Sequence, residues 1–94
     1  MAVVVVNEMQ GGDQGFYDEV TSVVMPGGRL PDGCKAHIAG PVDGGWRVIT
    51  VWDSDEQFQQ FRTETLIPAI QAQGRDDVVA PRIDSRPVYR HITA

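Results

Sequence analysis

The chain has few cysteines, few basic residues and no long apolar run, and each shortage argues against a class of protein. Cys34 is the only cysteine among 94 residues, which rules out an internal disulfide and any zinc site built from several thiolates. Eight basic residues against thirteen acidic ones give a net charge of −5, and phosphate backbones require clustered Lys and Arg. The apolar run Ala2 to Val6 is far shorter than the roughly 20 residues that span a bilayer. We therefore expect neither nucleic acid nor a membrane as a partner.

The composition is that of one small globular domain, residues 1–94. Its hydrophobic share of 41% and charged share of 22% are ordinary for a folded domain. A chain of this length buries only about 60–65% of the surface that it exposes when unfolded, so self-association would enlarge a thin core. The lone thiol and the lack of a leader pattern at the first residues predict a cytoplasmic protein.

The first third of the chain predicts a strand followed by a helix. Val3 to Val6 is β-branched throughout, which is typical of a central strand buried on both faces. Asp13 is a suitable N-cap for the helix that follows, and Pro26 marks its end. The apolar residues that share one face of this helix are Phe16, Val20, Val23 and Val24.

The middle of the chain predicts a hairpin and a second helix. Residues 34–41 and 46–53 are both strand-like, and Asp43-Gly44 between them is a strong hairpin turn signal. Ser54 followed by Gln57 forms a capping box, in which the Ser hydroxyl meets the Gln57 N–H and the Gln side chain reaches back. A helix therefore begins after Ser54.

The apolar face of the second helix changes direction near Pro68. Ile67 falls opposite the face that includes Phe58, so either Pro68 kinks the helix or Ile67 meets another surface, such as a partner subunit. Gly74 ends the helix. The residues on the Phe58 side are Phe61, Arg62, Thr65, Ala69 and Ala72.

The last strand completes the fold prediction. It runs over residues 82–92, and Pro87 within it cannot donate to a central ladder, so this strand is an edge strand or is bulged. The resulting order is βαββαβ. Two right-handed crossovers place both helices on one face of a four-stranded antiparallel sheet, which is the ferredoxin-like arrangement of the α+β class.

The other face of this sheet is predicted to be apolar as well. Pairing about the hairpin turn sets His37 opposite Thr50, while Ile38, Ile49 and Val51 point the other way. We assign these three aliphatic residues to the helix-covered face. The opposite face then carries His37, Ala39, Trp46, Val48, Thr50 and Trp52. An exposed apolar patch of this kind favours association in water, which predicts a homodimer packed sheet to sheet.

The chain resembles the dimeric α+β barrel proteins of the antibiotic biosynthesis monooxygenase type. The resemblance is carried by the turn 44–46, the strand end Val51-Trp52, the helix start Asp53-Ser54, and the pair Phe58 and Phe61. It implies a ferredoxin-like monomer, face-to-face sheets, and a cavity between sheet and helices or at the dimer interface. The superfamily includes cofactor-free oxygenases of aromatic polyketides such as anthrones, haem degraders, isomerases and members of unknown role.

The resemblance also points to particular residues. Trp52 matches the family's tryptophan before the second helix, and Asn7 matches an asparagine near the end of the first strand. Haem degraders add a helical histidine that binds iron, at about the position of Gln71 here. Because that ligand is missing, we expect no haem and no other cofactor.

Each candidate residue has a structural alternative. His37 could act as a base towards a phenol or an activated methylene, or it could be a strand histidine bonded to Thr50 or a carbonyl. Trp46 and Trp52 could be flat walls for an aromatic ligand or dimer-core packing. Asn7 could bond a ligand carbonyl or end its strand.

Three further side chains have similarly divided interpretations. Arg62 could snorkel, pair with an acid, or point its guanidinium into a cavity. Tyr17 could present its hydroxyl at a cavity mouth or be a half-exposed structural residue. Cys34 is interpreted as an inert small hydrophobe, and no spacing of ligands suggests a metal site.

The leading hypothesis is a homodimer that binds a small apolar or aromatic molecule. Its most concrete form is a cofactor-independent monooxygenase with His37 as the catalytic base. The substrate-binding residues are Asn7, Trp46, Thr50, Trp52 and Arg62. The alternatives are a non-catalytic binding or dimerisation module, and an isomerase or cyclase. A cavity closed by the tryptophans favours a structural role, whereas an open one with His37 free of internal hydrogen bonds favours chemistry.

Overall fold

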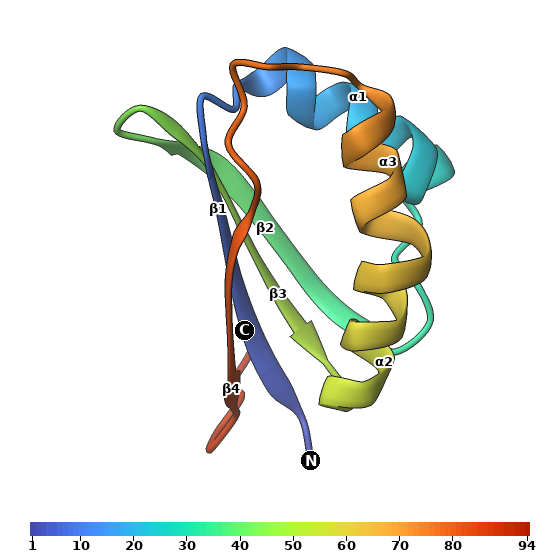
Figure 1. The fold of residues 1–94 in the computed structure, drawn as a ribbon. Helices are drawn as coiled ribbons and strands as arrows, with labels where there is room; N and C mark the ends of the chain where they lie inside the picture. The colour runs from blue at the N-terminus through green and yellow to red at the C-terminus, as the bar shows by residue number, and fades with distance from the viewer.

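One antiparallel sheet, with helices on one of its faces, makes up the computed structural model, which describes all 94 residues (Figure 1). The strand order is β2-β3-β1-β4. The elements are β1 Val3–Gln10, α1 Gln14–Val24, η1 Pro26–Gly28, β2 Cys34–Val42, β3 Gly45–Trp52, α2 Asp55–Phe61, η2 Arg62–Leu66, α3 Ile67–Ala72 and β4 Arg82–Pro87. Because α2, η2 and α3 follow one another without a break, the order is βαββαβ. The predicted α+β, ferredoxin-like fold is confirmed.

Both predicted helix caps form. The Asp13 carboxylate accepts the backbone N–H of Phe16 at 2.8 Å, which satisfies one of the free donors of the first turn of α1. The Ser54 hydroxyl accepts the N–H of Gln57 at 3.2 Å and donates to the Gln57 side-chain oxygen at 3.0 Å. These caps fix where both helices start.

The second helix passes Pro68 through a π-helical turn, η2. The N–H of Ile67 bonds to the carbonyl of Arg62, five residues back. Proline lacks an N–H and crowds the preceding turn, so a locally wider turn next to it relieves the conflict. The wider turn rotates the inward face, and Leu66 packs on the core while Ala72 is exposed. The interruption predicted at Pro68 is therefore present, one turn earlier.

β1 is one of the two central strands and β4 is an edge strand, as predicted. β4 ends at Pro87, earlier than the predicted residue 92, because proline cannot donate to the ladder and most of the residues that follow it are exposed. None of the helices combines the length and apolar content that a bilayer span requires.

The two faces of the sheet are the reverse of the prediction. The pairing of His37 with Thr50 is confirmed, but Thr50 and Trp52 are buried beneath the helices, and Ile38 is 65% exposed on the opposite face. Alternation along a strand tells which side chains share a face, but it cannot tell which face the helices cover when both are apolar. The uncovered side, called the open face below, carries Val4, Val6, Ile38, Ile49 and Val51.

Two groups of buried residues lie between the helices and the sheet. The first, at the α2 end, consists of Val3, Val5, Cys34, Trp52 and Phe58. The second, below α1 and α3, consists of Met9, Phe16, Val20 and Ala69. Val23, predicted on the buried face of α1, is 62% exposed instead.

Candidate functional site

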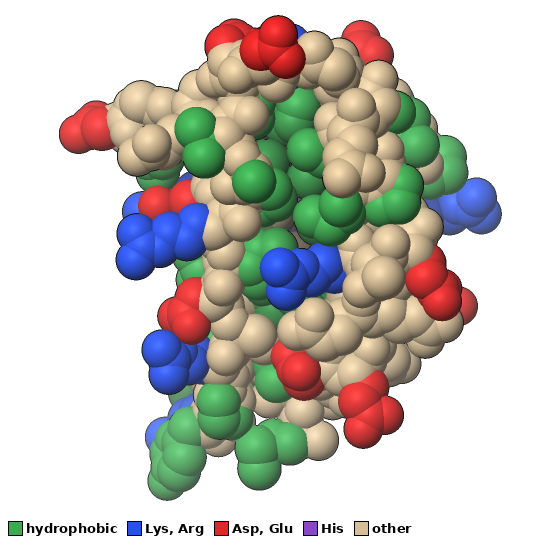
Figure 2. Space-filling model, in the orientation of Figure 1, with side chains coloured by type: hydrophobic (Ala, Val, Ile, Leu, Met, Phe, Trp, Pro, Cys, Tyr) green, Lys and Arg blue, Asp and Glu red, His purple; other side chains and the backbone are tan.

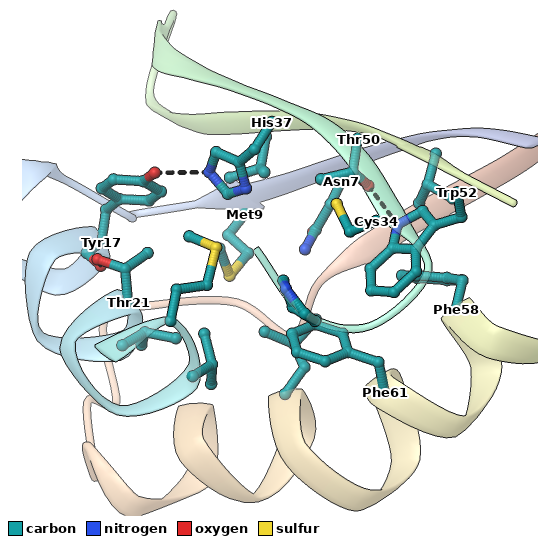
Figure 3. A pocket seen from close by; sticks show the side chains of 17 residues that line it. Asn7, Met9, Tyr17, Thr21, Cys34, His37, Thr50, Trp52, Phe58 and Phe61 are labelled. Carbon is teal, nitrogen blue, oxygen red and sulfur yellow. Dashed lines mark hydrogen bonds between the residues drawn. The ribbon is translucent and has the colours of Figure 1, made fainter. Parts of the chain in front are cut away.

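A cavity of about 60 Å³ lies between the sheet and the helices (Figure 3). Figure 2 shows apolar side chains gathered in the hollow between these two layers. The 17 lining residues are Val5, Asn7, Met9, Tyr17, Val20, Thr21, Val24, Met25, Pro31, Cys34, His37, Val48, Thr50, Trp52, Phe58, Phe61 and Leu66. None of them is Asp, Glu, Lys or Arg, so the cavity wall carries no permanent charge.

His37 and Tyr17 meet at one end of this cavity. β2 points His37 towards the helices, and α1 brings the Tyr17 hydroxyl to within 2.6 Å of His37 Nε2 (Figure 3). The Tyr17 ring also packs against Trp46, with 5.4 Å between ring centroids. His37 Nδ1 makes no hydrogen bond within the chain, so it is available to a ligand.

Burial keeps both members of this pair uncharged at neutral pH. Removal from water lowers the pKa of His37 below its ordinary value of 6.5. Removal from water, and then the charge of Asp18, raises the pKa of Tyr17 above 10.0. A neutral imidazole can accept a proton at one nitrogen, which is what a general base requires.

Trp52 and Thr50 form the other end of the cavity. Trp52 Nε1 donates to Thr50 Oγ1 at 2.8 Å (Figure 3). The Trp52 ring packs against Phe58 and Phe61, with centroids 5.6 and 5.2 Å apart. This aromatic group forms a packed apolar wall.

Asn7 is a buried polar residue in the lining of this apolar space. The residue is only 7% exposed, and its Oδ1 has no hydrogen-bond partner. A buried acceptor without a partner costs about 1–3 kcal/mol, so the Asn7 carboxamide is the lining group that would gain most from a bound ligand.

Four of the six predicted site residues line the cavity together: His37, Asn7, Thr50 and Trp52. Trp46 lies behind Tyr17, outside the lining, with its buried Nε1 unpaired. Arg62 is also outside the lining, and its guanidinium reaches Gln59 Oε1 at 3.5 Å.

The sequence-based prediction gave too little weight to Tyr17. Tyr17, Thr21 and Val24 all line the cavity and are spaced at i, i+4 and i+7, a second inward stripe beside the Phe16 stripe. That spacing was the signal that could have found Tyr17. Cys34 is buried and donates its thiol to the carbonyl of Ala36, and burial raises its pKa, which fits an inert side chain.

The cavity is small for a ligand. Pockets that hold drug-sized molecules measure about 300–1,000 Å³, whereas this one has room for only about four to six water molecules. Trp46 does not line it, as expected of a site for chemistry, but His37 is not free of internal hydrogen bonds, because its Nε2 is bonded to Tyr17. The lining therefore combines apolar walls with a few polar groups, as ligand pockets do, in a volume smaller than that of ordinary ligand pockets.

Comparison with known proteins gives a clear result for the fold. No protein-family model and no curated protein matches the chain. SnoaB, a cofactor-independent oxygenase from Streptomyces nogalater, is 16% identical over 99% of this chain and 98% of its own, with a TM-score of 0.67. A protein from Deinococcus radiodurans that carries the provisional name antibiotic biosynthesis monooxygenase is 14% identical over 98% of this chain and 97% of its own, with a TM-score of 0.66.

A third solved structure is the heme-degrader MhuD from Mycobacterium tuberculosis, with two hemes in its active site. It is 22% identical over 97% of this chain and 99% of its own, with a TM-score of 0.58. All three identities are low, so these likenesses establish the fold and no more. The chain has the fold of the antibiotic biosynthesis monooxygenase-like proteins, which confirms the predicted resemblance at that level.

The site does not fit a haem held from the second helix. Gln71, where the resemblance places the iron ligand of haem degraders, is exposed on α3. The residues of this helix that do line the cavity are Phe58, Phe61 and Leu66, and none of them can bind iron.

We predict that His37 titrates below pH 6.5, because burial disfavours its charged form. The measurement is a pH titration of the two histidine side chains by NMR, with the exposed His91 as the reference signal. In Tyr17→Phe the Nε2 partner is lost, so the shifts of the His37 ring nitrogens should change while those of His91 stay the same. A His37 midpoint at or above 6.5 would contradict the buried, neutral imidazole.

Proposed function

We propose that this chain binds an aromatic molecule with its uncharged ring in the cavity and oxygenates it with dioxygen, without a cofactor. One observation carries the proposal: a neutral imidazole with a free Nδ1 and a buried carboxamide, that of Asn7, whose Oδ1 has no partner, line the same uncharged, apolar cavity. The shared fold with SnoaB, a cofactor-independent oxygenase, supports the reaction class. Burying an ion in such a cavity is costly, so the part of the substrate inside the cavity should be uncharged.

The chemistry begins with removal of a proton. The proposal uses the His37 tautomer whose proton is on Nε2, where it donates to the Tyr17 oxygen. His37 Nδ1 then takes a proton from an activated methylene of the substrate, such as that of an anthrone, and leaves a carbanion. The carbanion transfers electrons to dioxygen, and a C–O bond forms to give a peroxide, which takes up a proton. The O–O bond then breaks, and water leaves with the second hydrogen of the former methylene. In sum, CH₂ and O₂ become C=O and H₂O, so dioxygen is the only oxidant.

The other lining residues bind and orient the substrate. The side-chain N–H of Asn7 donates to the substrate oxygen that gains negative charge when the proton leaves, and a hydrogen bond that strengthens at that stage lowers the barrier. Trp52, held by Thr50 and two phenylalanines, supports the aromatic ring. Tyr17 holds the His37 ring in place.

A second candidate is a non-catalytic module. The small volume of the cavity favours this second candidate, because a space of about 60 Å³ holds no aromatic ring system without rearrangement. In that case Asn7 and His37 would bond to enclosed water.

Oxygen uptake separates the two candidates. The experiment follows dissolved oxygen with a panel of anthrones and hydroquinones and records tryptophan fluorescence in the same samples. Uptake above the rate without protein supports the oxygenase. Quenching without uptake indicates a binding module. The absence of both signals would contradict the ligand class as well as the reaction.

The open face leads to a second part of the proposal, a homodimer packed sheet to sheet. Five aliphatic side chains cover its centre, and the Glu8–Arg47 ion pair, at 2.9 Å, lies at its margin. A second copy matches this surface, because a two-fold axis brings apolar centre onto apolar centre. The interface proposed here uses the aliphatic residues and leaves Trp46 and Trp52 inside each subunit.

Ile38→Lys should shift the chain from dimer to monomer at micromolar concentration, because it places a charge in the apolar interface. Sedimentation equilibrium measures the change. Val23→Lys is the matched control, since Val23 on α1 is 62% exposed and Ile38 is 65% exposed, but only Ile38 lies on the open face. A monomeric wild type, or equal dissociation of both variants, would contradict the proposed interface.

A further inference from the structure

A second, polar recess lies directly outside the cavity. It measures about 300 Å³ and is bounded by the loop before β2 and the outer side of α2 and η2. Asp32, Gln60 and Glu64 contribute polar groups to it, and none of its lining residues is Lys or Arg. Two residues, Pro31 and Phe61, line both this recess and the cavity.

Phe61 therefore separates the two spaces. On the cavity side its ring packs against Trp52, with 5.2 Å between centroids, and it is only half-buried because the recess lies on its other side. It is the last residue of α2, next to the π-helical turn, where the regular helical ladder changes. A change in the Phe61 rotamer would join the spaces without a change in the fold.

Joining the cavity and the recess would make room for an aromatic ligand that the cavity alone is too small to hold. The cavity alone is too small for an aromatic ring system, whereas the cavity together with the recess reaches the volume of ordinary ligand pockets, about 300–1,000 Å³. On the cavity side, the Oδ1 atom of Asn7 has no hydrogen-bond partner within the chain, so this side lacks a polar group that a ligand would supply.

We infer that the ligand site extends past Phe61, so that an aromatic ring occupies the cavity and a polar end of the same molecule lies in the recess. The carboxylates of Asp32 and Glu64 favour an uncharged or cationic group at that end of the ligand, and they disfavour an anionic group. This inference rests on the proposed ligand site, and it adds the substrate class: an amphipathic aromatic molecule with a hydroxyl or amine on its polar end. It does not depend on oxygenation.

The test uses three probes that share one ring and differ in the charge of a short tail: naphthylethylamine, naphthylethanol and naphthylacetate. Equilibrium dialysis gives their affinities for the wild-type protein. We expect the acetate to bind about tenfold more weakly than the amine, since two nearby carboxylates together are worth about 1.4 kcal/mol. Asp32→Asn combined with Glu64→Gln should remove most of this difference.

Two comparisons make the result specific. Glu19→Gln combined with Asp43→Asn changes the net charge equally at exposed positions outside the recess, and it should leave the order of affinities unchanged. Phe61→Leu should speed association of all three probes severalfold, because a smaller side chain then separates the spaces. Its melting temperature, measured alongside, shows that the variant is folded.

The outcomes distinguish this inference from the proposed function. Equal affinities for the three probes, or an unchanged association rate in Phe61→Leu, would overturn the extended site and leave the oxygenase proposal standing. Binding of none of the probes would overturn the extended site together with the aromatic ligand. The predicted order of affinities supports the extended site even if no oxygen is consumed.

Discussion

His37→Ala should lower kcat/KM for oxygen uptake with an anthrone by about 10²- to 10⁴-fold, the range usual for loss of a general base. The reason is that His37 is the only residue in the cavity lining that can accept a proton near neutral pH, because burial raises the pKa values of Tyr17 and Cys34. An oxygen electrode measures the rate. His37→Gln, which keeps a polar group opposite Tyr17, should be equally inactive. If both variants melt at the wild-type temperature, neither loss of activity is due to unfolding.

The pH dependence of the same reaction provides an independent check. The active form is the neutral imidazole, so kcat/KM should fall as the pH decreases through the pKa of His37. Because burial lowers that pKa, the midpoint should lie below 6.5. An acid limb with a midpoint above 6.5, or one that persists in His37→Ala, would assign the base to another group.

Trp52→Ala should lower the free energy of unfolding by about 3–5 kcal/mol, the usual cost of truncating a buried tryptophan. Trp52 is 1% exposed, packs against Phe58 and Phe61, and donates its indole N–H to Thr50. Domains are stable by only about 5–15 kcal/mol in total, so this one change removes a large part of the stability. Urea denaturation followed by circular dichroism, at a fixed protein concentration, measures the loss.

Trp52→Phe is the matched control for this change. It keeps an aromatic ring in the core and removes the indole N–H, so its cost should be clearly smaller than that of Trp52→Ala. Equal losses for the two variants, or a loss below about 1 kcal/mol for Trp52→Ala, would mean that Trp52 is not part of the packed core described above.

The fold could be predicted from sequence because its signals are local. Asp13 and Ser54 start their helices through their own side chains, and Gly44 in the hairpin turn has the positive φ, 74°, that the Asp43-Gly44 pair predicts. Each of these contacts involves residues only a few positions apart. The order of elements and the right-handed crossover rule then place both helices on one face of the sheet.

The site was less predictable because it depends on which face the helices cover. Ile38, Ile49 and Val51 are as apolar as the set that includes Trp52, so no pattern along the strands distinguishes the inner face. The Tyr17–His37 contact joins residues 20 positions apart through the packing of α1 on the sheet. Cavity volume and the dividing role of Phe61 depend on side-chain packing, which sequence patterns do not describe.

The most direct test of the account is the fate of dioxygen in the reaction of the wild-type protein with an anthrone. Under isotopically labelled dioxygen, mass spectrometry of the product should show one labelled oxygen at the former methylene carbon, formed faster than in a sample without protein. A product formed no faster than in that blank, or one whose new oxygen comes from water, would contradict the proposal that this cavity oxygenates an aromatic substrate.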